Sequence, residues 1–133
     1  MLVNQQQSVS EEIDALGPRP KKRRAAPEAG LQKAILQYCL WRGIFAHHSP
    51  NEGKRTAITG RRMKAEGMRS GYPDLTCVGR GNVLFLELKA PGGVLSDAQK
   101  QCHANMRRAG ARLAVVRSVE EAEIAFRDAG LLP

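Results

Sequence analysis

The feature that most restricts the fold is a pair of short apolar segments separated by a turn. Residues 75–78 (LTCV) and 83–88 (VLFLEL) are rich in the β-branched, aromatic and aliphatic side chains that suit strands. Between them lies Gly79-Arg80-Gly81-Asn82, which offers two glycines where the chain must reverse. We therefore expect an antiparallel β-hairpin, with alternate side chains on its two faces.

Further strands and helices are expected around this hairpin. Apolar side chains at helical spacing predict a helix that begins near Pro27 and ends at Gly43, and residues 44–48 read as a short strand after it. Capping boxes at Ser96 to Gln99 and at Ser118 to Glu121 each predict the start of a helix. The other expected elements are a helix around residues 56–66 and a buried strand over residues 113–116.

This alternation of strands and helices predicts one α/β domain, in which helices cover a mixed sheet. A length of 133 residues fits a single domain, which we place at residues 28–133. Residues 1–27 are polar and glutamine-rich, and they include the basic run RPKKRR from Arg19 to Arg24. We expect this part to form a flexible basic arm.

Positive charge dominates the chain and is unevenly placed. Lysine and arginine total 21 against 13 aspartate and glutamate, which gives a net charge of +8. Such a chain is attracted to polyanions, of which nucleic acids are the most common. A solvated basic surface explains any single lysine, but the whole distribution favours nucleic acid. The candidate DNA-binding residues lie in one basic stretch and are Lys54, Arg55, Arg61, Arg62, Lys64 and Arg69.

The cysteines and the overall hydropathy bear on the cellular setting. Three scattered cysteines imply no disulfide framework, and neither they nor the three histidines follow the spacing of a zinc site. No apolar stretch is long enough to span a membrane, and the N-terminus lacks the features of a signal peptide. We therefore expect a soluble, cytoplasmic protein.

Two acids and a lysine fall at the ends of the hairpin strands. Asp74 precedes the first strand, and Glu87 lies within the apolar run of the second, where a charge is costly to bury. Because side chains alternate along a strand, Lys89 shares a face with Glu87, and Leu88 points the other way into the core. Carboxylates on neighbouring strands can converge on one hard cation such as Mg²⁺ or Mn²⁺.

Such a site suits phosphodiester hydrolysis. A bound metal lowers the pKa of a water and stabilises charge on a phosphate, and Lys89 would sit beside both. The alternative is that Glu87 and Lys89 are ordinary solvent-facing residues of an edge strand. A Glu-x-Lys alone arises by chance in many proteins, whereas Pro-Asp followed by Glu-x-Lys across a turn is more specific.

From about Glu28 to the last expected helix, the chain resembles the virus-type replication-repair nuclease (VRR-NUC) family of the PD-(D/E)XK superfamily. The matching motifs are Glu28 with Gln32, Pro50-Asn51-Glu52, Gly71-Tyr72-Pro73-Asp74-Leu75, Glu87-Leu88-Lys89, Leu95-Ser96-x-x-Gln99 and Val115-Val116-Arg117. Ser118 departs from the family's Val-Arg-Arg pattern. The resemblance implies a restriction-endonuclease-like α/β fold, with a mixed central sheet flanked by helices and an αβββαβ core.

By the same resemblance, Asp74 and Glu87 would bind the metal with the backbone carbonyl of Leu88, and Lys89 would be the catalytic lysine. Gln99 would help to position Lys89 or the substrate. Glu28 would stand near the site and could ligate a second metal or a metal-bound water. Structural alternatives stay open for two of these residues, because Gln99 also completes a capping box and Glu28 also favours a helix N-terminus.

The resemblance implies a Mg²⁺- or Mn²⁺-dependent endonuclease that acts on branched DNA. Stand-alone viral and bacterial members resemble homodimeric Holliday-junction resolvases, and a two-fold dimer suits symmetric cleavage of a four-way junction. The alternatives are a nuclease of flaps and other branched ends, and a DNA-binding module without catalysis. No P-loop or Rossmann glycine pattern supports an enzyme of nucleotide metabolism.

Overall fold

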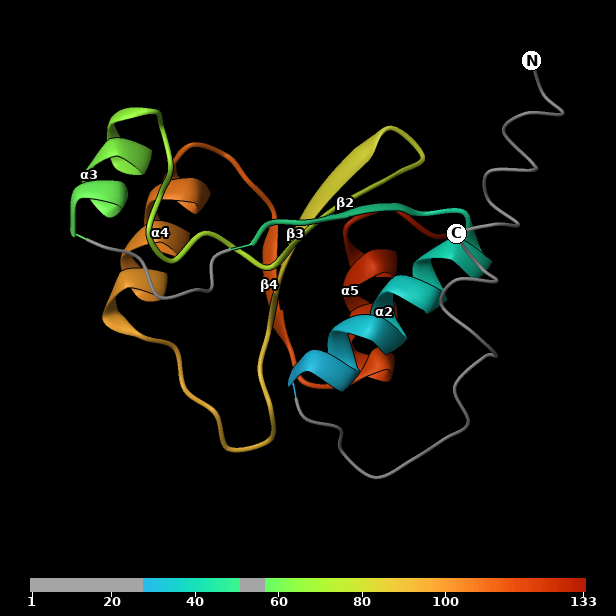
Figure 1. The fold of residues 1–133 in the computed structure, drawn as a ribbon. Helices are drawn as coiled ribbons and strands as arrows, with labels where there is room; N and C mark the ends of the chain where they lie inside the picture. The colour runs from blue at the N-terminus through green and yellow to red at the C-terminus, as the bar shows by residue number, and fades with distance from the viewer. Residues whose placement is uncertain (1–27, 51–56) are drawn as a thin grey trace, which may run out of the picture.

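The computed structural model describes residues 28–50 and 57–133, and Figure 1 shows their arrangement. The order of elements agrees with the expected one, and the α/β fold class is confirmed. The arm expected over residues 1–27 lies outside the described residues. The elements are α2 (Glu28–Arg42), β1 (Phe45–His48), α3 (Ala57–Ala65), β2 (Leu75–Gly79), β3 (Asn82–Leu88), α4 (Asp97–Arg108), β4 (Leu113–Val116) and α5 (Val119–Asp128).

The four strands form one mixed sheet in the order β1-β2-β3-β4. The pairs β1–β2 and β2–β3 are antiparallel, whereas β3 and β4 are parallel. The predicted hairpin pairs Gly79 with Asn82, which leaves Arg80 and Gly81 as a two-residue turn. Both turn residues have positive φ, 52° and 77°, as the twist of a tight hairpin favours.

Helices α2 and α5 cover one face of the sheet and enclose the core with it. Leu75 and Leu86 are directly opposite each other on β2 and β3 and are fully buried. They belong to one cluster with Ile35 of α2 and Phe126 of α5. Figure 1 shows α2 and α5 side by side, with α4 on the opposite side of β4. The alternate strand residues therefore point to the face where α4 lies.

The two predicted capping boxes differ in the structure. Ser96 Oγ accepts a hydrogen bond from the Gln99 amide at 3.1 Å, and the Ser96 amide donates to Gln99 Oε1 at 2.9 Å, so the box at α4 is complete. At α5 only half of the predicted box forms, because the Glu121 carboxylate accepts from the Arg117 amide and not from that of Ser118. Because β4 is an edge strand, the Arg117 amide just beyond its end needs a hydrogen-bond acceptor from outside the sheet, and the Glu121 carboxylate is that acceptor.

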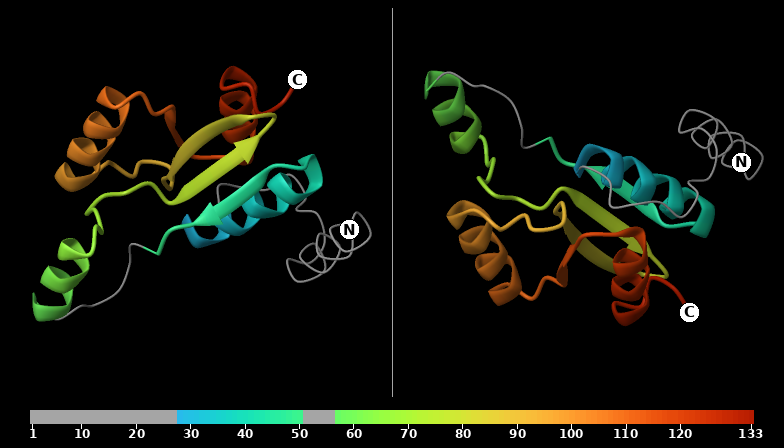
Figure 2. Two further views of the ribbon diagram at one scale, coloured as in Figure 1. Left: turned by 90° about the horizontal axis from the view of Figure 1, so that it is seen from above. Right: turned by 90° about the horizontal axis from the view of Figure 1, so that it is seen from below.

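Helix α3 stands apart from the other elements. Among the described parts of the chain, no other helix or strand packs substantially against it, and every view in Figures 1 and 2 places it at an outer end of the molecule. Its Ile58 is 73% exposed. Nine residues are too few for a helix that is stable alone in water. None of its residues belongs to the core cluster that the described residues form, so α3 is a peripheral element of this fold.

Two other expectations concern the cysteines and the membrane. Cys39, Cys77 and Cys102 are free and buried, as the expectation of no disulfide framework requires. None of the helices in the described ranges is both long and apolar enough to cross a membrane.

Gly71 allows the loop before β2 to contact the start of α4. Its φ is +75°, and a Cβ atom there would overlap the backbone of Ala98 and Gln99. We expect Gly71→Ala to lower the free energy of unfolding by more than about 2 kcal/mol, because a steric clash adds to the cost of the left-handed backbone. Chemical denaturation measures this loss.

Gly43→Ala is the matched control. Its φ is +70°, but nothing lies within 4 Å of the added Cβ, so we expect a loss of about 1 kcal/mol from the backbone alone. Equal losses in the two variants would show that the contact between the Gly71 loop and α4 contributes nothing.

Candidate active site

Asp74 is held at the junction of three strands. Its backbone carbonyl accepts hydrogen bonds from the Ser49 amide at 2.9 Å and from His48 Nδ1 at 3.2 Å, which ties it to the end of β1. Its side-chain Oδ2 accepts from the Leu88 amide at 2.8 Å, which ties it to the end of β3. These contacts place the Asp74 carboxylate beside the last residues of β3.

Glu87 is a buried acid on the face of β3 that α4 covers, with a relative exposure of 1%. Each of its oxygens has a partner from α4. Oε1 accepts a hydrogen bond from Gln99 Nε2 at 2.9 Å, and Oε2 lies 3.0 Å from His103 Nε2. The neighbouring Leu88 points to the opposite face and lies in the core, as alternation along the strand predicts.

The Glu87 carboxyl group is strongly perturbed. Burial raises its pKa most, and the charge of Asp74 and a hydrogen bond with Asp74 add to the rise, while the charge of Lys89 opposes it. The result is a pKa of about 8, against an ordinary value of 4.5. Burial also lowers the pKa of His103, so the ring facing Glu87 favours its neutral form. The site thus pairs a buried acid, Glu87, with a half-buried one, Asp74, and the charge of Asp74 disfavours ionisation of Glu87.

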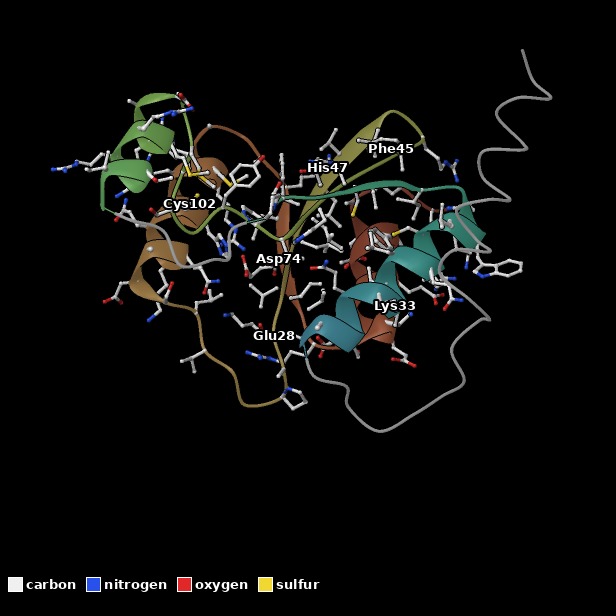
Figure 3. The ribbon with its side chains drawn as sticks, in the orientation of Figure 1. Glu28, Lys33, Phe45, His47, Asp74 and Cys102 are labelled. Atoms are coloured by element: carbon white, nitrogen blue, oxygen red, sulfur yellow. The ribbon has the colours of Figure 1, made fainter. Side chains whose placement is uncertain are left out.

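Lys89 and Glu28 complete the group around these acids. The Lys89 amide donates to the Val116 carbonyl at 3.1 Å, so the residue continues the line of β3 beyond its end. Glu28, in the first turn of α2, accepts a hydrogen bond from the Ala90 amide at 3.4 Å, and its charge also raises the pKa of Glu87. In the view of Figure 3, Glu28 and Asp74 both lie near the middle of the molecule. The structure therefore brings together the five residues singled out from the sequence, Glu28, Asp74, Glu87, Lys89 and Gln99.

The two carboxylates suit a hard divalent cation. Asp74 and Glu87 offer only oxygen ligands, and a cation between them would relieve the repulsion that raises the pKa of Glu87. Within residues 28–50 and 57–133, no three His, Cys, Asp or Glu side chains are grouped so as to hold an ion by themselves. A cation here would have two carboxylate ligands, and the Leu88 carbonyl and water would supply the rest. Mg²⁺ is commonly bound in that way.

The predicted DNA-binding residues lie outside this group. Arg61, Arg62 and Lys64 are exposed on α3, and Arg62 forms an ion pair with Glu66 at 3.1 Å that is itself solvent-exposed. Arg69 is exposed on the loop that follows α3. Two further candidates, Lys54 and Arg55, lie outside the described residues, as do Asn51 and Glu52 of the Pro50-Asn51-Glu52 motif.

His103 is a site residue that sequence reasoning missed. The histidines and cysteines do not follow the spacing of a zinc site, so no role was predicted for His103. Its position four residues after Gln99 was the available signal, because residues at i and i+4 share one face of a helix.

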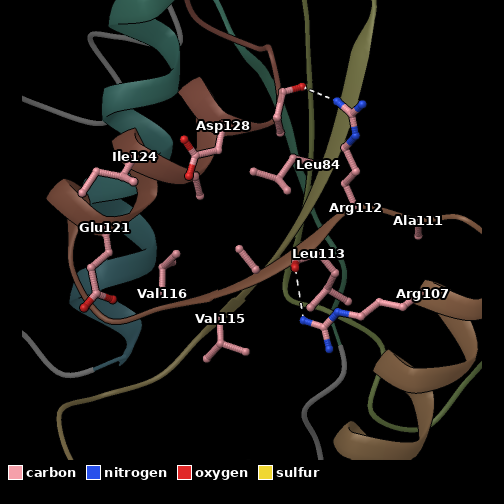
Figure 4. A pocket seen from close by; sticks show the side chains of 13 residues that line it. Leu84, Arg107, Ala111, Arg112, Leu113, Val115, Val116, Glu121, Ile124 and Asp128 are labelled. Atoms are coloured by element: carbon pink, nitrogen blue, oxygen red, sulfur yellow. Dashed lines mark hydrogen bonds between the residues drawn. The ribbon is translucent and has the colours of Figure 1, made fainter.

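A groove in the described part of the chain lies away from this site. It has a volume of about 620 Å³ and is bounded by β4, α5 and the end of α4 (Figure 4). Its two arginines are tied to backbone carbonyls, Arg107 to Leu113 at 3.1 Å and Arg112 to Ala129 at 2.8 Å. Glu87 and Asp74 do not line it. The groove is therefore separate from the two acids.

The family model of the VRR-NUC domain matches residues 25–120. The chain belongs to the VRR-NUC family. The matched range includes all the residues of the site described above, from Glu28 to His103. Membership makes the protein a nuclease-type, DNA-processing protein with DNA as its substrate.

Two solved structures share the fold of this VRR-NUC chain. One, described as a VRR_NUC domain protein, has a TM-score of 0.61 at 21% identity, over 80% of this chain and 89% of the other. A second, described as a VRR_NUC domain, has a TM-score of 0.56 at 25% identity, over 77% of this chain and 97% of the other. No curated protein matches the chain. These likenesses support the predicted mixed sheet with flanking helices.

The pKa of Glu87 predicts a pH-dependent stability of the metal-free VRR-NUC domain. Because the folded pKa of about 8 exceeds the ordinary 4.5, the folded state binds more protons between these values. The stability that the protonated carboxyl provides is fully present below pH 4.5 and is lost as the pH rises through 8. In EDTA, Glu87→Gln should therefore stabilise the protein little at pH 5 and by up to about 4 kcal/mol at pH 9. Denaturation at the two pH values measures the difference.

Asp128→Asn serves as the control, because Asp128 is exposed at the end of α5, away from the acids. It should show no comparable gain at high pH. A Glu87→Gln gain that is the same at pH 5 and pH 9 would show that Glu87 is not protonated in the folded protein.

Proposed function

We propose that this chain is a Mg²⁺- or Mn²⁺-dependent endonuclease that hydrolyses phosphodiester bonds in branched DNA. The observation that carries the proposal is the convergence of Asp74 and Glu87 beside Lys89, at the ends of two neighbouring strands. A VRR-NUC domain processes DNA, and these residues are the group in the described chain that is equipped for hydrolysis.

Each residue of the group has a distinct role in the proposed reaction. Asp74, Glu87 and the Leu88 carbonyl would hold the divalent metal, which when bound would supply a Lewis acid and lower the pKa of a water. The Lys89 ammonium orients the attacking water and offsets negative charge on the phosphate. Water adds to phosphorus as the bond to the leaving sugar oxygen breaks. The water loses a proton in this step, and the leaving oxygen takes up a proton in turn. Glu28 would bind a water at this metal site.

The branched form of the substrate and a homodimeric assembly are further parts of the proposal. They rest on the resemblance to stand-alone family members of the Holliday-junction-resolvase kind, and a two-fold dimer would present two active sites to a four-way junction. A flap nuclease is the second candidate within the same chemistry. Sedimentation analysis of the full chain, alone and with a four-way junction, tests the assembly.

Helix α3 is the proposed DNA contact. Arg61, Arg62 and Lys64 are exposed on a helix that has no substantial packing within the described residues. The phosphate backbone offers both the opposite charge and the missing contact surface. Arg69 continues this basic surface towards α4, because its charge acts on Cys102 of that helix.

Cleavage of labelled four-way junction, flap and linear duplex DNA tests the proposed chemistry. With Mg²⁺ or Mn²⁺ we expect the wild type to cut branched DNA, and with EDTA we expect no cleavage. Asp74→Asn and Glu87→Gln should lose cleavage by a factor of about 10³ or more, because each removes a metal ligand, while DNA binding persists. Lys89→Ala should bind metal as the wild type does but cleave far more slowly.

Asp128→Asn is the charge-matched control and should cleave normally. Metal binding has its own readout, since Mn²⁺ should raise the melting temperature of the wild type but not that of Asp74→Asn. If the wild type binds branched DNA yet leaves it intact with every metal, the protein is a DNA-binding module without catalysis.

The contribution of α3 is measured by the salt dependence of DNA binding. Arg61→Gln and Lys64→Gln should each weaken binding and reduce the slope of log Kd against log salt by about 0.9, the value for one lost phosphate contact. Lys33→Gln removes an exposed positive charge from α2 and should leave the slope unchanged. Equal slopes for all three variants would remove α3 from the DNA interface.

A further inference from the structure

Two side chains of α4 hold the two oxygens of Glu87. Gln99 Nε2 donates to Oε1 at 2.9 Å, and His103 Nε2 contacts Oε2 at 3.0 Å. Gln99 and His103 are one helical turn apart, so a single face of α4 supplies both contacts. The His103 and Glu87 side chains are 1% and 2% exposed, so water does not compete for the His103 contact.

The direction of the His103 hydrogen bond follows from the state of its partner. An ionised carboxylate only accepts hydrogen bonds, so Nε2 of His103 must carry a proton whenever Glu87 is ionised. Each carboxylate oxygen keeps another lone pair after accepting one bond. Gln99 and His103 can therefore fix the orientation of Glu87 and still leave it free to bind a cation.

The second ring nitrogen of His103 argues against a role in packing alone. Nδ1 is buried and has no hydrogen-bond partner, although buried polar atoms are almost always paired. An apolar side chain of similar size would fill the same space without leaving such an atom unsatisfied. Among the described residues, the contact with Glu87 is the one polar interaction that the ring makes.

We propose that His103 is a positioning residue of the nuclease site, whose Nε2–H holds the Glu87 carboxylate in the orientation that binds the divalent metal. The inference rests on the proposed function, because Glu87 must be a metal ligand for its orientation to matter. Residues that hydrogen-bond to metal ligands commonly change metal affinity or activity when they are replaced. His103 acts through Glu87 and does not itself touch the metal or the DNA.

Substitutions that separate hydrogen bonding from packing test this role. His103→Leu keeps much of the volume but removes the donor, and we expect it to weaken Mn²⁺ binding by about ten- to a hundredfold. His103→Gln places an amide donor near the position of Nε2 and should restore most of the affinity. Gln101→Leu is the control on the exposed face of α4, where its amide donates to Asn105 Oδ1 at 3.1 Å, and it should bind Mn²⁺ normally.

Calorimetry with Mn²⁺ and cleavage at varied Mn²⁺ are measured on the full chain, with circular dichroism to verify folding. For His103→Leu, the Mn²⁺ concentration at half-maximal cleavage should rise, while the rate at saturating Mn²⁺ recovers. Normal Mn²⁺ affinity in folded His103→Leu, or no recovery in folded His103→Gln, overturns the positioning role alone. A wild type that neither binds Mn²⁺ nor cleaves DNA overturns the proposed function, and this inference with it.

A spectroscopic measurement on the wild type keeps the proposal testable even if these variants fail to fold. In the Mg²⁺-bound protein, two-bond ¹H–¹⁵N correlations of the imidazole rings identify the protonated nitrogen of each histidine. We expect His103 to carry a proton on Nε2 that exchanges slowly with solvent, because the ring is buried. A ring without a proton on Nε2 contradicts the proposal.

Discussion

A carboxylic acid buried within an apolar strand is the constraint on which the rest of this structure depends. Glu87 lies between Leu86 and Leu88 on β3, and both of these neighbours belong to the core on the other face. Such a group is tolerated only where hydrogen bonds replace water, and α4 supplies them through Gln99 and His103. The capping box at Ser96 fixes where α4 begins. It therefore also fixes the position along β3 at which the side chains of Gln99 and His103 meet the strand.

The local elements could be predicted from the sequence because their signals are local. The glycine-containing turn fixed the hairpin, and the strand over residues 113–116 has the same bounds in the structure. The complete capping box at Ser96 was predictable, whereas the half-formed one at Ser118 was not, because the Arg117 amide competes for Glu121. The parallel pairing of β3 with β4 depends on packing between distant segments, which no short motif encodes.

The candidate site was also predictable only in part. Alternation along β3 placed Glu87 and Lys89 on one face, and the Pro-Asp motif placed Asp74 at the start of the neighbouring strand. The depth at which Glu87 is buried, and the resulting rise of its pKa, could not be predicted, because they depend on a helix that lies over the strand. His103 was missed for this reason, since a single histidine in a helix points to no function until the strand residue that it contacts is known.

The isolation of α3 frees its residues from the two requirements, packing and chemistry, that restrict much of the rest of the chain. Core residues are chosen for packing and catalytic residues for chemistry, but α3 contributes little to either within the described chain. Its side chains can therefore vary in charge and size with little penalty in folding or in catalysis. In the proposed role of α3 as a DNA contact, related chains could change which DNA structures they bind by altering this one helix, while Asp74 and Glu87 stay the same.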